Sequence, residues 1–295
     1  MRRRATNAAG QESLDDCRLL TCSPTVTARR SSMHVRFPAL VAVALLLQAF
    51  PPPAVADVKT EVIHFTHGTE EIQGLIAWND EAAGPQPGVI IIHGGWGYSE
   101  NVRAQAVRLA QSGYVGFAVD MYGMGPVETH LEDDRGARKL LEDNPLLRAM
   151  RFSLAVERLK QHPRVDAGRI SAIGYCWGGE VILEMARAGA RFDALITFAG
   201  ILSTDNPATA GYVHPRVLVL HGDSDPYAPP EQVEAFRGEM TAAGADFEIV
   251  GYPDVEHAFC QPDAREADME GISYDEEADN DSWDRVLALL DEVYD

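Results

Sequence analysis

The sequence predicts an α/β fold in which a mostly parallel, eight-stranded sheet is flanked by helices. From Val58 onward, short apolar or β-branched runs alternate with longer segments of helical period, which is the pattern of strands joined through helices. The runs at 89–92 and 217–220 are continuously apolar, as expected of strands buried on both faces. No internal repeat or low-complexity linker divides residues 57–295, so a single domain is expected there.

Eight segments have the composition of strands. The second follows the first after a short turn at 66–69, so we expect these two to pair antiparallel at one edge of the sheet. The expected strands are 58–65, 72–78, 89–92, 115–119, 170–174, 194–198, 217–220 and 247–250.

Five segments have helical period together with helix boundary signals. Asn144 precedes Pro145 and a periodic apolar run, which suits an N-cap followed by proline in the first turn. The acidic stretch 263–284 interrupts the alternation, and we expect it to be a solvent-exposed excursion before the last helix. The expected helices are 99–112, 145–161, 177–188, 230–242 and 282–293.

The N-terminal region has the pattern of a secretory signal peptide. Its apolar run, 37–50, is shorter than the ~20 residues of a membrane-spanning helix, and Ala54 and Ala56 before residue 57 fit the small-residue cleavage pattern. Met33 stands where such a signal normally begins, and a retained membrane anchor is the alternative. We expect residues 1–56 to be an N-terminal extension plus a cleaved signal peptide. Residues 57–295 are then periplasmic or secreted, without stable membrane association.

Charge and cysteine content exclude several classes of protein. The chain has 25 basic and 45 acidic residues, which gives a formal charge of −20. Residues 57–295 hold 18 of the basic and 42 of the acidic residues, which gives a charge of −24. This charge repels phosphate backbones, so no nucleic-acid partner is expected. Only Cys176 and Cys260 lie beyond residue 56, too few for a disulfide framework and without the paired spacing of a zinc site. We therefore expect no bound metal.

The segment 173–179 is typical of a nucleophile on a sharp turn. Gly174, Cys176 and Gly178 form a G-x-C-x-G pattern between a predicted buried strand and a predicted helix. Side chains two residues before and two after the nucleophile would clash in such a turn, which explains the glycines. The Trp177 backbone N–H then points toward an oxyanion forming on a substrate, and the helix dipole favours a thiolate. A buried, inert cysteine beside a tight turn is the structural alternative.

Two later segments supply the groups that a nucleophilic thiol needs. Asp225 follows the strand at 217–220, where a loop carboxylate can reach the turn, whereas Asp223 is expected to cap its own loop. His257 follows the last predicted strand and completes the order nucleophile, acid, histidine. His257 would take the proton of Cys176 and later return one to the leaving group, while Asp225 holds the imidazole tautomer.

With these residues the sequence resembles the dienelactone hydrolase family, enzymes of the α/β-hydrolase fold with a Cys-His-Asp triad. The matching motifs lie at 89–97, 113–123, 169–179, 217–233 and 256–259. The resemblance implies hydrolysis of a small carboxylic ester or lactone through an acyl-thioester on the cysteine, without a cofactor. It also implies that the backbone N–H of Gly95 is the second oxyanion donor.

The sequence departs from the family pattern at two positions. Members often have Glu where this chain has Gly94, and the dienelactone-specific enzymes have Arg where it has Gln261, four residues after the histidine. Gly94 removes a carboxylate from beside the nucleophile, so we expect Cys176 to rest largely as a thiolate. Gln261 predicts a preference for neutral esters, unless Arg135 or Arg138 binds anions.

The remaining assignments concern the pocket and the partner. Trp96 and Tyr122 are candidates to line the substrate pocket, although each also suits the core, and His93 is expected to be a structural part of the oxyanion loop. The expected partner is a small-molecule ester or lactone, and the expected state is a monomer or weak homodimer. The alternatives are a non-catalytic binding protein that keeps the fold, and a redox pair of Cys176 and Cys260.

Overall fold

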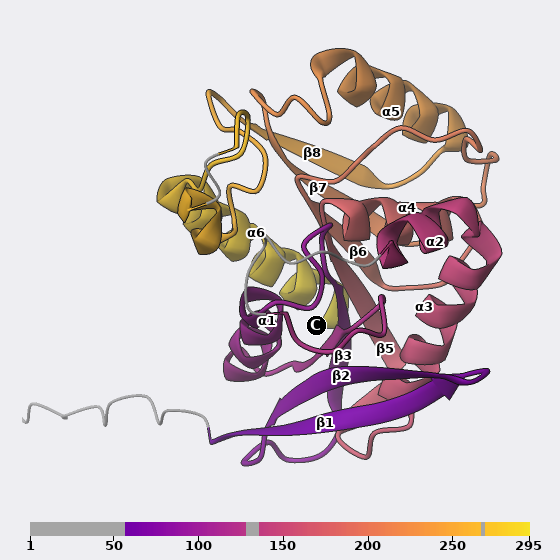
Figure 1. Ribbon diagram of the computed structural model, residues 1–295, viewed down its shortest axis with the longest axis vertical. Helices are drawn as coiled ribbons and strands as arrows, with labels where there is room; N and C mark the ends of the chain where they lie inside the picture. Colours follow the sequence, from indigo (N-terminus) through magenta and orange to yellow (C-terminus); the bar gives the residue numbers. More distant parts are fainter. Residues whose placement is uncertain (1–56, 128–135, 267–268) are drawn as a thin grey trace, which may run out of the picture. The chain divides into compact units, whose positions relative to one another are not determined.

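The computed structural model describes residues 57–127, 136–266 and 269–295 (Figure 1). The predicted leader, residues 1–56, lies outside the described residues, as does Arg135. Within the three described ranges, no helix combines the length and the apolar composition needed to cross a membrane.

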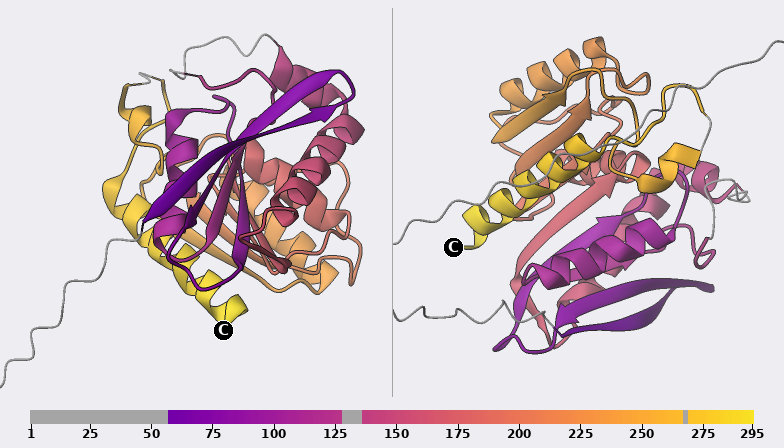
Figure 2. Two further views of the ribbon diagram at one scale, coloured as in Figure 1. Left: turned by 90° about the horizontal axis from the view of Figure 1, so that it is seen from below. Right: turned by 90° about the vertical axis from the view of Figure 1, so that its left-hand side faces the viewer.

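One sheet of eight strands confirms the predicted fold class. Its strands are β1 (Val58–His67), β2 (Glu70–Asn79), β3 (Gln86–Ile92), β4 (Val115–Val119), β5 (Val165–Tyr175), β6 (Ala194–Phe198), β7 (Arg216–Gly222) and β8 (Phe247–Tyr252). Their order across the sheet is β1-β2-β4-β3-β5-β6-β7-β8. β2 pairs antiparallel with β1 and with β4, and all other neighbours are parallel. The predicted antiparallel first pair is confirmed, and Figure 2 shows it at the edge of the twisted sheet.

Helices cover both faces of the sheet (Figure 1). Along β3, Val89 and Ile91 pack with α1 and α6, whereas Ile90 and Ile92 pack with α3 and α4. All four side chains are fully buried, as predicted for this strand. The helices are α1 (Glu100–Gln111), α2 (Ala137–Asp143), α3 (Pro145–Lys160), α4 (Trp177–Arg187), α5 (Pro230–Ala243) and α6 (Glu276–Tyr294), with a short 3₁₀ turn, η1 (Pro262–Glu266).

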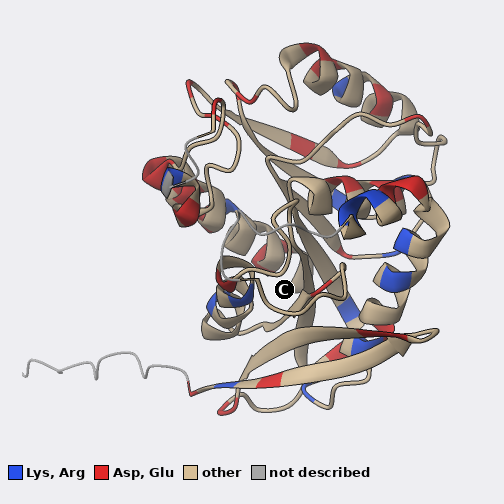
Figure 3. Cartoon of the chain, in the orientation of Figure 1, with Lys and Arg blue, Asp and Glu red and all other residues tan. Residues whose placement is uncertain are grey.

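The last helix begins earlier than the sequence predicts. α6 starts at Glu276 rather than at residue 282, because the Asp275 side chain accepts a hydrogen bond from the backbone N–H of Ala278 at 2.9 Å. Acidic side chains fill its first turn, where the helix dipole favours negative charge, and Figure 3 shows this red cluster. The prediction of a solvent-exposed excursion is therefore wrong for the second half of the stretch 263–284.

The short helix α2 was not expected from the sequence. It follows Gly136, which has a left-handed backbone with φ of 73°, and no side chain caps its first turn. Leu141 is its one buried residue, so the segment carries almost no apolar periodicity. This helix matters for the site because it carries Arg138.

The turn from β5 into α4 depends on close backbone contacts that only glycine allows. A Cβ on Gly174 would overlap the carbonyl oxygen of Gly178, and a Cβ on Gly178 would overlap the carbonyl oxygens of Ile92 and His93. The steric reason predicted for the G-x-C-x-G pattern is thus confirmed. The same contacts bring the carboxyl end of β3 against the start of α4, so the loops that follow β3 and β5 lie together.

Replacing Gly178 by alanine should destabilise the fold by about 1–3 kcal/mol, the usual cost of forcing extra atoms into a packed site. The measurement is urea unfolding followed by tryptophan fluorescence. Gly238→Ala is the matched control, because Gly238 lies in α5 with no heavy atom within 4 Å of its added Cβ. The control should be neutral or stabilised by up to ~1 kcal/mol, since alanine is the better helix former. Equal unfolding midpoints for the two variants would contradict the steric account.

Candidate active site

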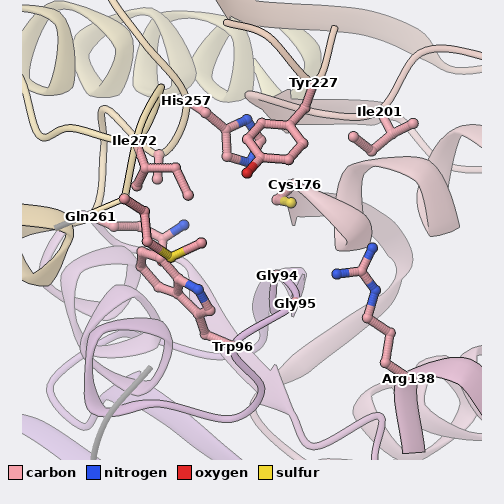
Figure 4. A pocket seen from close by; sticks show the side chains of 12 residues that line it. Gly94, Gly95, Trp96, Arg138, Cys176, Ile201, Tyr227, His257, Gln261 and Ile272 are labelled. Carbon is pink, nitrogen blue, oxygen red and sulfur yellow. The ribbon is translucent and has the colours of Figure 1, made fainter. Parts of the chain in front are cut away.

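Cys176 stands on the sharp turn between β5 and α4. Its φ of 50° and ψ of −114° are strained for a residue other than glycine, and its backbone N–H donates to the carbonyl of Phe198 at 2.9 Å. The side chain is partly exposed at the floor of a cavity (Figure 4). This strand-to-helix placement presents a thiol to a bound molecule.

Asp225 and His257 reach the thiol from the loops after β7 and β8. His257 Nδ1 donates to Asp225 Oδ2 at 2.7 Å, and the two residues are 4% and 2% exposed. The same carboxylate accepts the Tyr227 backbone N–H through Oδ1 at 2.8 Å. The imidazole also hydrogen-bonds the side chain of Cys176. The structure thus brings the three predicted residues together, whereas Asp223 is exposed.

The contacts of the thiol and the imidazole favour their charged forms. Burial raises the pKa of Cys176, but the hydrogen bond and charge of His257, with the backbone N–H groups of Gly95 and Trp177, outweigh it and lower the pKa overall. Burial lowers the pKa of His257, but its hydrogen bonds to Asp225 and Cys176 raise it to about 10. The contacts of both groups thus act in the direction of a thiolate beside an imidazolium.

Two backbone N–H groups face the sulfur from the other side. They belong to Gly95, in the loop after β3, and Trp177, the first residue of α4. These are the two groups that the sequence and the family resemblance predict as oxyanion donors. A carbonyl oxygen on a substrate attacked by Cys176 would lie within their reach.

The cavity above Cys176 has a volume of about 170 Å³. Trp96 lines it, as predicted, and Gln261 lies on the same side (Figure 4). Arg138 approaches from the opposite side, with its Nε donating to Glu142 at 2.7 Å. The lining residues are Gly94, Gly95, Trp96, Arg138, Cys176, Ile201, Tyr227, His257, Ala258, Gln261, Met269 and Ile272.

Tyr122 is a correction to the predicted pocket. It is 6% exposed and does not line the cavity, because its ring packs behind the loop after β3. The ring centroid lies 4.4 Å from that of His93 and 5.3 Å from that of Trp177. The hydroxyl donates to the carbonyl of Gly95 at 3.3 Å. Tyr122 therefore contacts the oxyanion loop rather than the space where a substrate would bind.

His93 is a buried structural histidine, as expected from the sequence. Its Nδ1–H donates to the carbonyl of Gly94 at 2.8 Å, and its Nε2 accepts the backbone N–H of Met121 at 3.1 Å. Burial lowers the pKa of His93 to about 4. With both nitrogens engaged in the neutral form, this imidazole has no free position for proton transfer.

Several lining residues were not predicted from the sequence. The ring centroid of Tyr227 lies 4.6 Å from that of His257. Tyr227 follows Asp225 by two residues, and this closeness in sequence to the predicted acid could have indicated its place in the site. Met269 and Ile272 lie in the acidic stretch, whose composition gave no sign of a pocket wall. Arg138, one of the two arginines that the sequence offers for anion binding, lines the cavity.

No cluster of three or more His, Cys, Asp or Glu side chains suited to a metal occurs among the residues that the structure describes. Cys176 and Cys260 are both free thiols, and Cys260 is 2% exposed. The structure therefore gives no support to a disulfide between them.

Known proteins are similar to this chain over most of its length. The solved structure of m3DLH has a TM-score of 0.74 and 32% identity, covering 81% of this chain and 99% of that one. A dienelactone hydrolase-like promiscuous phosphotriesterase from metagenomic libraries has a TM-score of 0.74 and 29% identity, covering 80% and 98%. A Yersinia pestis relative, provisionally named a carboxymethylenebutenolidase, is 27% identical over 74% of this chain and 82% of its own. The family profile described as dienelactone hydrolase family matches residues 72–294, and the chain accordingly belongs to that family of ester-bond hydrolases with an α/β-hydrolase fold.

Proposed function

We propose that this hydrolase cleaves small carboxylic esters or lactones through an acyl-thioester on Cys176. One observation carries the proposal: the thiol stands on a strained turn with His257 on one side and two backbone N–H groups on the other, at the floor of a cavity. His257 acts as acid and base, and Asp225 fixes its tautomer through the 2.7 Å hydrogen bond.

Acylation begins from the thiolate and imidazolium pair. The sulfur of Cys176 attacks the carbonyl carbon, a C–S bond forms, and the carbonyl electrons move onto oxygen. The N–H groups of Gly95 and Trp177 stabilise this oxyanion. The intermediate then collapses and the bond between the carbonyl carbon and the alkoxy oxygen breaks. His257 gives its proton to the departing alkoxide. In a lactone the released alcohol stays attached to the acyl group.

Deacylation reverses these roles with water as the nucleophile. Neutral His257 takes a proton from water as its oxygen attacks the thioester carbonyl. Collapse of the second tetrahedral intermediate breaks the C–S bond and releases the carboxylic acid and the thiolate of Cys176. His257 keeps the proton taken from water, so the resting pair is restored. Asp225, which is 2% exposed, stabilises the imidazolium throughout.

Turnover of a p-nitrophenyl ester tests the proposal directly. Wild type should show a burst followed by steady turnover, and Cys176→Ala should lose both, because no acyl-thioester can form. Asp225→Asn should lower turnover by orders of magnitude, as a wrong imidazole tautomer costs ~10⁴ in serine triads. Asp223→Asn is the matched control and should remain near wild type.

Equal losses in the two aspartate variants would contradict the role of Asp225. Binding of the ester without a burst, in wild type and Cys176→Ala alike, would favour a non-catalytic binding protein instead.

Alkylation of Cys176 by iodoacetamide should proceed readily at pH 7. The contacts of the thiol lower its pKa, so reactivity should rise with pH through a midpoint below the free-thiol value of ~8.5. Gly94→Glu should raise this midpoint by like-charge repulsion, because its Cβ would lie 3.3 Å from Cys176 Cβ. Gly94→Gln is the control of equal size. Mass spectrometry of the labelled peptide gives the rates, and a midpoint at or above 8.5, or equal shifts in both variants, would contradict the resting thiolate.

Neutral esters should be preferred over anionic ones. Gln261 supplies no charge to the cavity, and the charge of Arg138 is offset by Glu142 at 2.7 Å. We expect a higher kcat/KM for p-nitrophenyl butyrate than for p-nitrophenyl hemisuccinate. Glu142→Gln removes the carboxylate paired with Arg138, so it should reduce the difference in kcat/KM between the two esters. Glu157→Gln is the control, because it alters only an exposed ion pair with Lys160 and should leave that difference unchanged. Faster hydrolysis of the hemisuccinate by wild type would reverse this prediction.

Export is the remaining part of the proposal. Residues 1–56 act as a leader that is removed after Ala56, and residues 57–295 work in the periplasm or outside the cell. N-terminal sequencing of the protein from the periplasmic fraction should begin at or near Asp57. Recovery of the chain in the membrane fraction with residues 37–50 retained would replace this proposal with an anchored enzyme.

A further inference from the structure

Two glycines, Gly94 and Gly95, begin the oxyanion loop, which is the loop after β3. Gly94 and Gly95 carry no side chains, yet the Gly95 N–H must point at the sulfur of Cys176. That N–H belongs to the peptide between Gly94 and Gly95. Because a trans peptide is planar, its C=O and N–H point in opposite directions, and fixing one end fixes the other.

The far end of this peptide is held by His93. The Gly94 carbonyl accepts the Nδ1–H of His93 at 2.8 Å and the backbone N–H of Gly97 at 3.1 Å. Nε2 of the same imidazole accepts the Met121 N–H at 3.1 Å, which fixes both the tautomer and the ring orientation. The loop after β4 therefore holds the imidazole, and the imidazole holds the oxyanion peptide.

The next peptide is held by Tyr122. Its hydroxyl donates to the Gly95 carbonyl at 3.3 Å, and its ring packs against Trp177, which supplies the other N–H. Tyr122 is itself held by Asp120, a fully buried carboxylate that accepts backbone N–H groups from residues 122, 123 and 125 at 3.1, 2.9 and 2.6 Å. The loop after β4 thus contacts the Gly95 carbonyl directly through Tyr122 and the Gly94 carbonyl indirectly through His93.

We propose that His93 and Tyr122 are positioning residues for the reaction, which clamp the oxyanion loop from behind so that the Gly95 N–H faces the reacting atom. This inference rests on the proposed function, because it gives the Gly95 N–H an oxyanion to stabilise. Neither side chain lines the cavity, so neither is expected to contact substrate.

A positioning role and a merely structural role predict different effects of a substitution on kcat, on the alkylation midpoint of Cys176 and on stability. Loss of a clamp misaligns a donor that acts on the transition state, so kcat falls while KM stays near its value. It also weakens a contact of the thiolate, so the midpoint for alkylation of Cys176 rises. Loss of a structural contact lowers the free energy of unfolding and changes neither quantity in the folded enzyme.

Tyr122→Phe is the first test, because it removes only the hydroxyl that reaches Gly95. Complete loss of one oxyanion donor costs ~10²–10³ in kcat, so a misaligned donor should cost about tenfold. KM for p-nitrophenyl butyrate should stay within about twofold, and the alkylation midpoint of Cys176 should rise. Tyr114→Phe is the matched control: Tyr114 precedes β4, at the opposite end of that strand from Tyr122, is 5% exposed and donates to Asp291 at 2.5 Å. In this control only the free energy of unfolding should fall, and kcat and the alkylation midpoint should stay unchanged.

A pair of substitutions at His93 gives the second test. Asparagine keeps a side-chain N–H near the position of Nδ1, so His93→Asn should retain part of the kcat, whereas His93→Leu removes the donor and should retain less. Each variant is measured at a temperature where circular dichroism shows it folded. If His93→Leu does not fold, Tyr122→Phe and His93→Asn still decide the question.

The outcomes separate the inference from the function on which it rests. Turnover and a burst in wild type, with kcat and alkylation midpoint unchanged in Tyr122→Phe, would overturn the clamp and leave the cysteine mechanism intact. The clamp would also be overturned if Tyr122→Phe lowered kcat without changing the alkylation midpoint of Cys176, and Tyr114→Phe lowered kcat equally. Such a result would show a general effect of stability. Absence of any burst in wild type would instead count against the proposed function.

Discussion

The strained turn at Cys176 is the constraint on which the site depends. The chain must leave buried β5 and enter α4 within one residue, and the φ of 50° at Cys176 is the result. This turn is possible because Gly178 lets α4 approach the carbonyl oxygens at the end of β3. The close approach places the loop after β3 beside the thiol, so that Gly95 and Trp177 face one atom. The close packing at Gly178 therefore brings the thiol and both proposed oxyanion donors together, while the contacts behind the loop after β3 orient the Gly95 N–H.

Short-range contacts decide the charge of the site against a strongly acidic background. Residues 57–295 carry a formal charge of −24, which disfavours a thiolate at long range. Exposed charges are screened beyond ~8–10 Å at moderate salt, whereas His257 and two N–H groups contact the sulfur directly. The imidazolium is in turn stabilised by Asp225, which is buried and has its other oxygen bound by the Tyr227 N–H. Local hydrogen bonds therefore act on the thiol more directly than the net charge does.

The sequence predicts the parts of the site that lie at the ends of buried strands. Cys176, Asp225 and His257 each follow such a strand, and strand order in a parallel sheet brings their loops to one edge. Arg138 and Met269 could not be placed, because they lie in segments with little apolar periodicity. The sequence wrongly suggests Tyr122 as a pocket residue, because a pattern of residues does not reveal on which side of a loop a ring packs. That information comes only from tertiary contacts.

Gly94 changes what the oxyanion donors must do. The N–H groups of Gly95 and Trp177 lower the pKa of the thiol, and in the proposed mechanism the same groups stabilise the transition-state oxyanion. Stabilising the thiolate too strongly would slow the reaction, since nucleophilicity falls as thiol pKa falls, and the best thiol has a pKa near ambient pH. Burial of Cys176 opposes this, because it raises the pKa that His257 and the N–H groups lower. Burial and hydrogen bonding therefore shift the pKa of the proposed nucleophile in opposite directions.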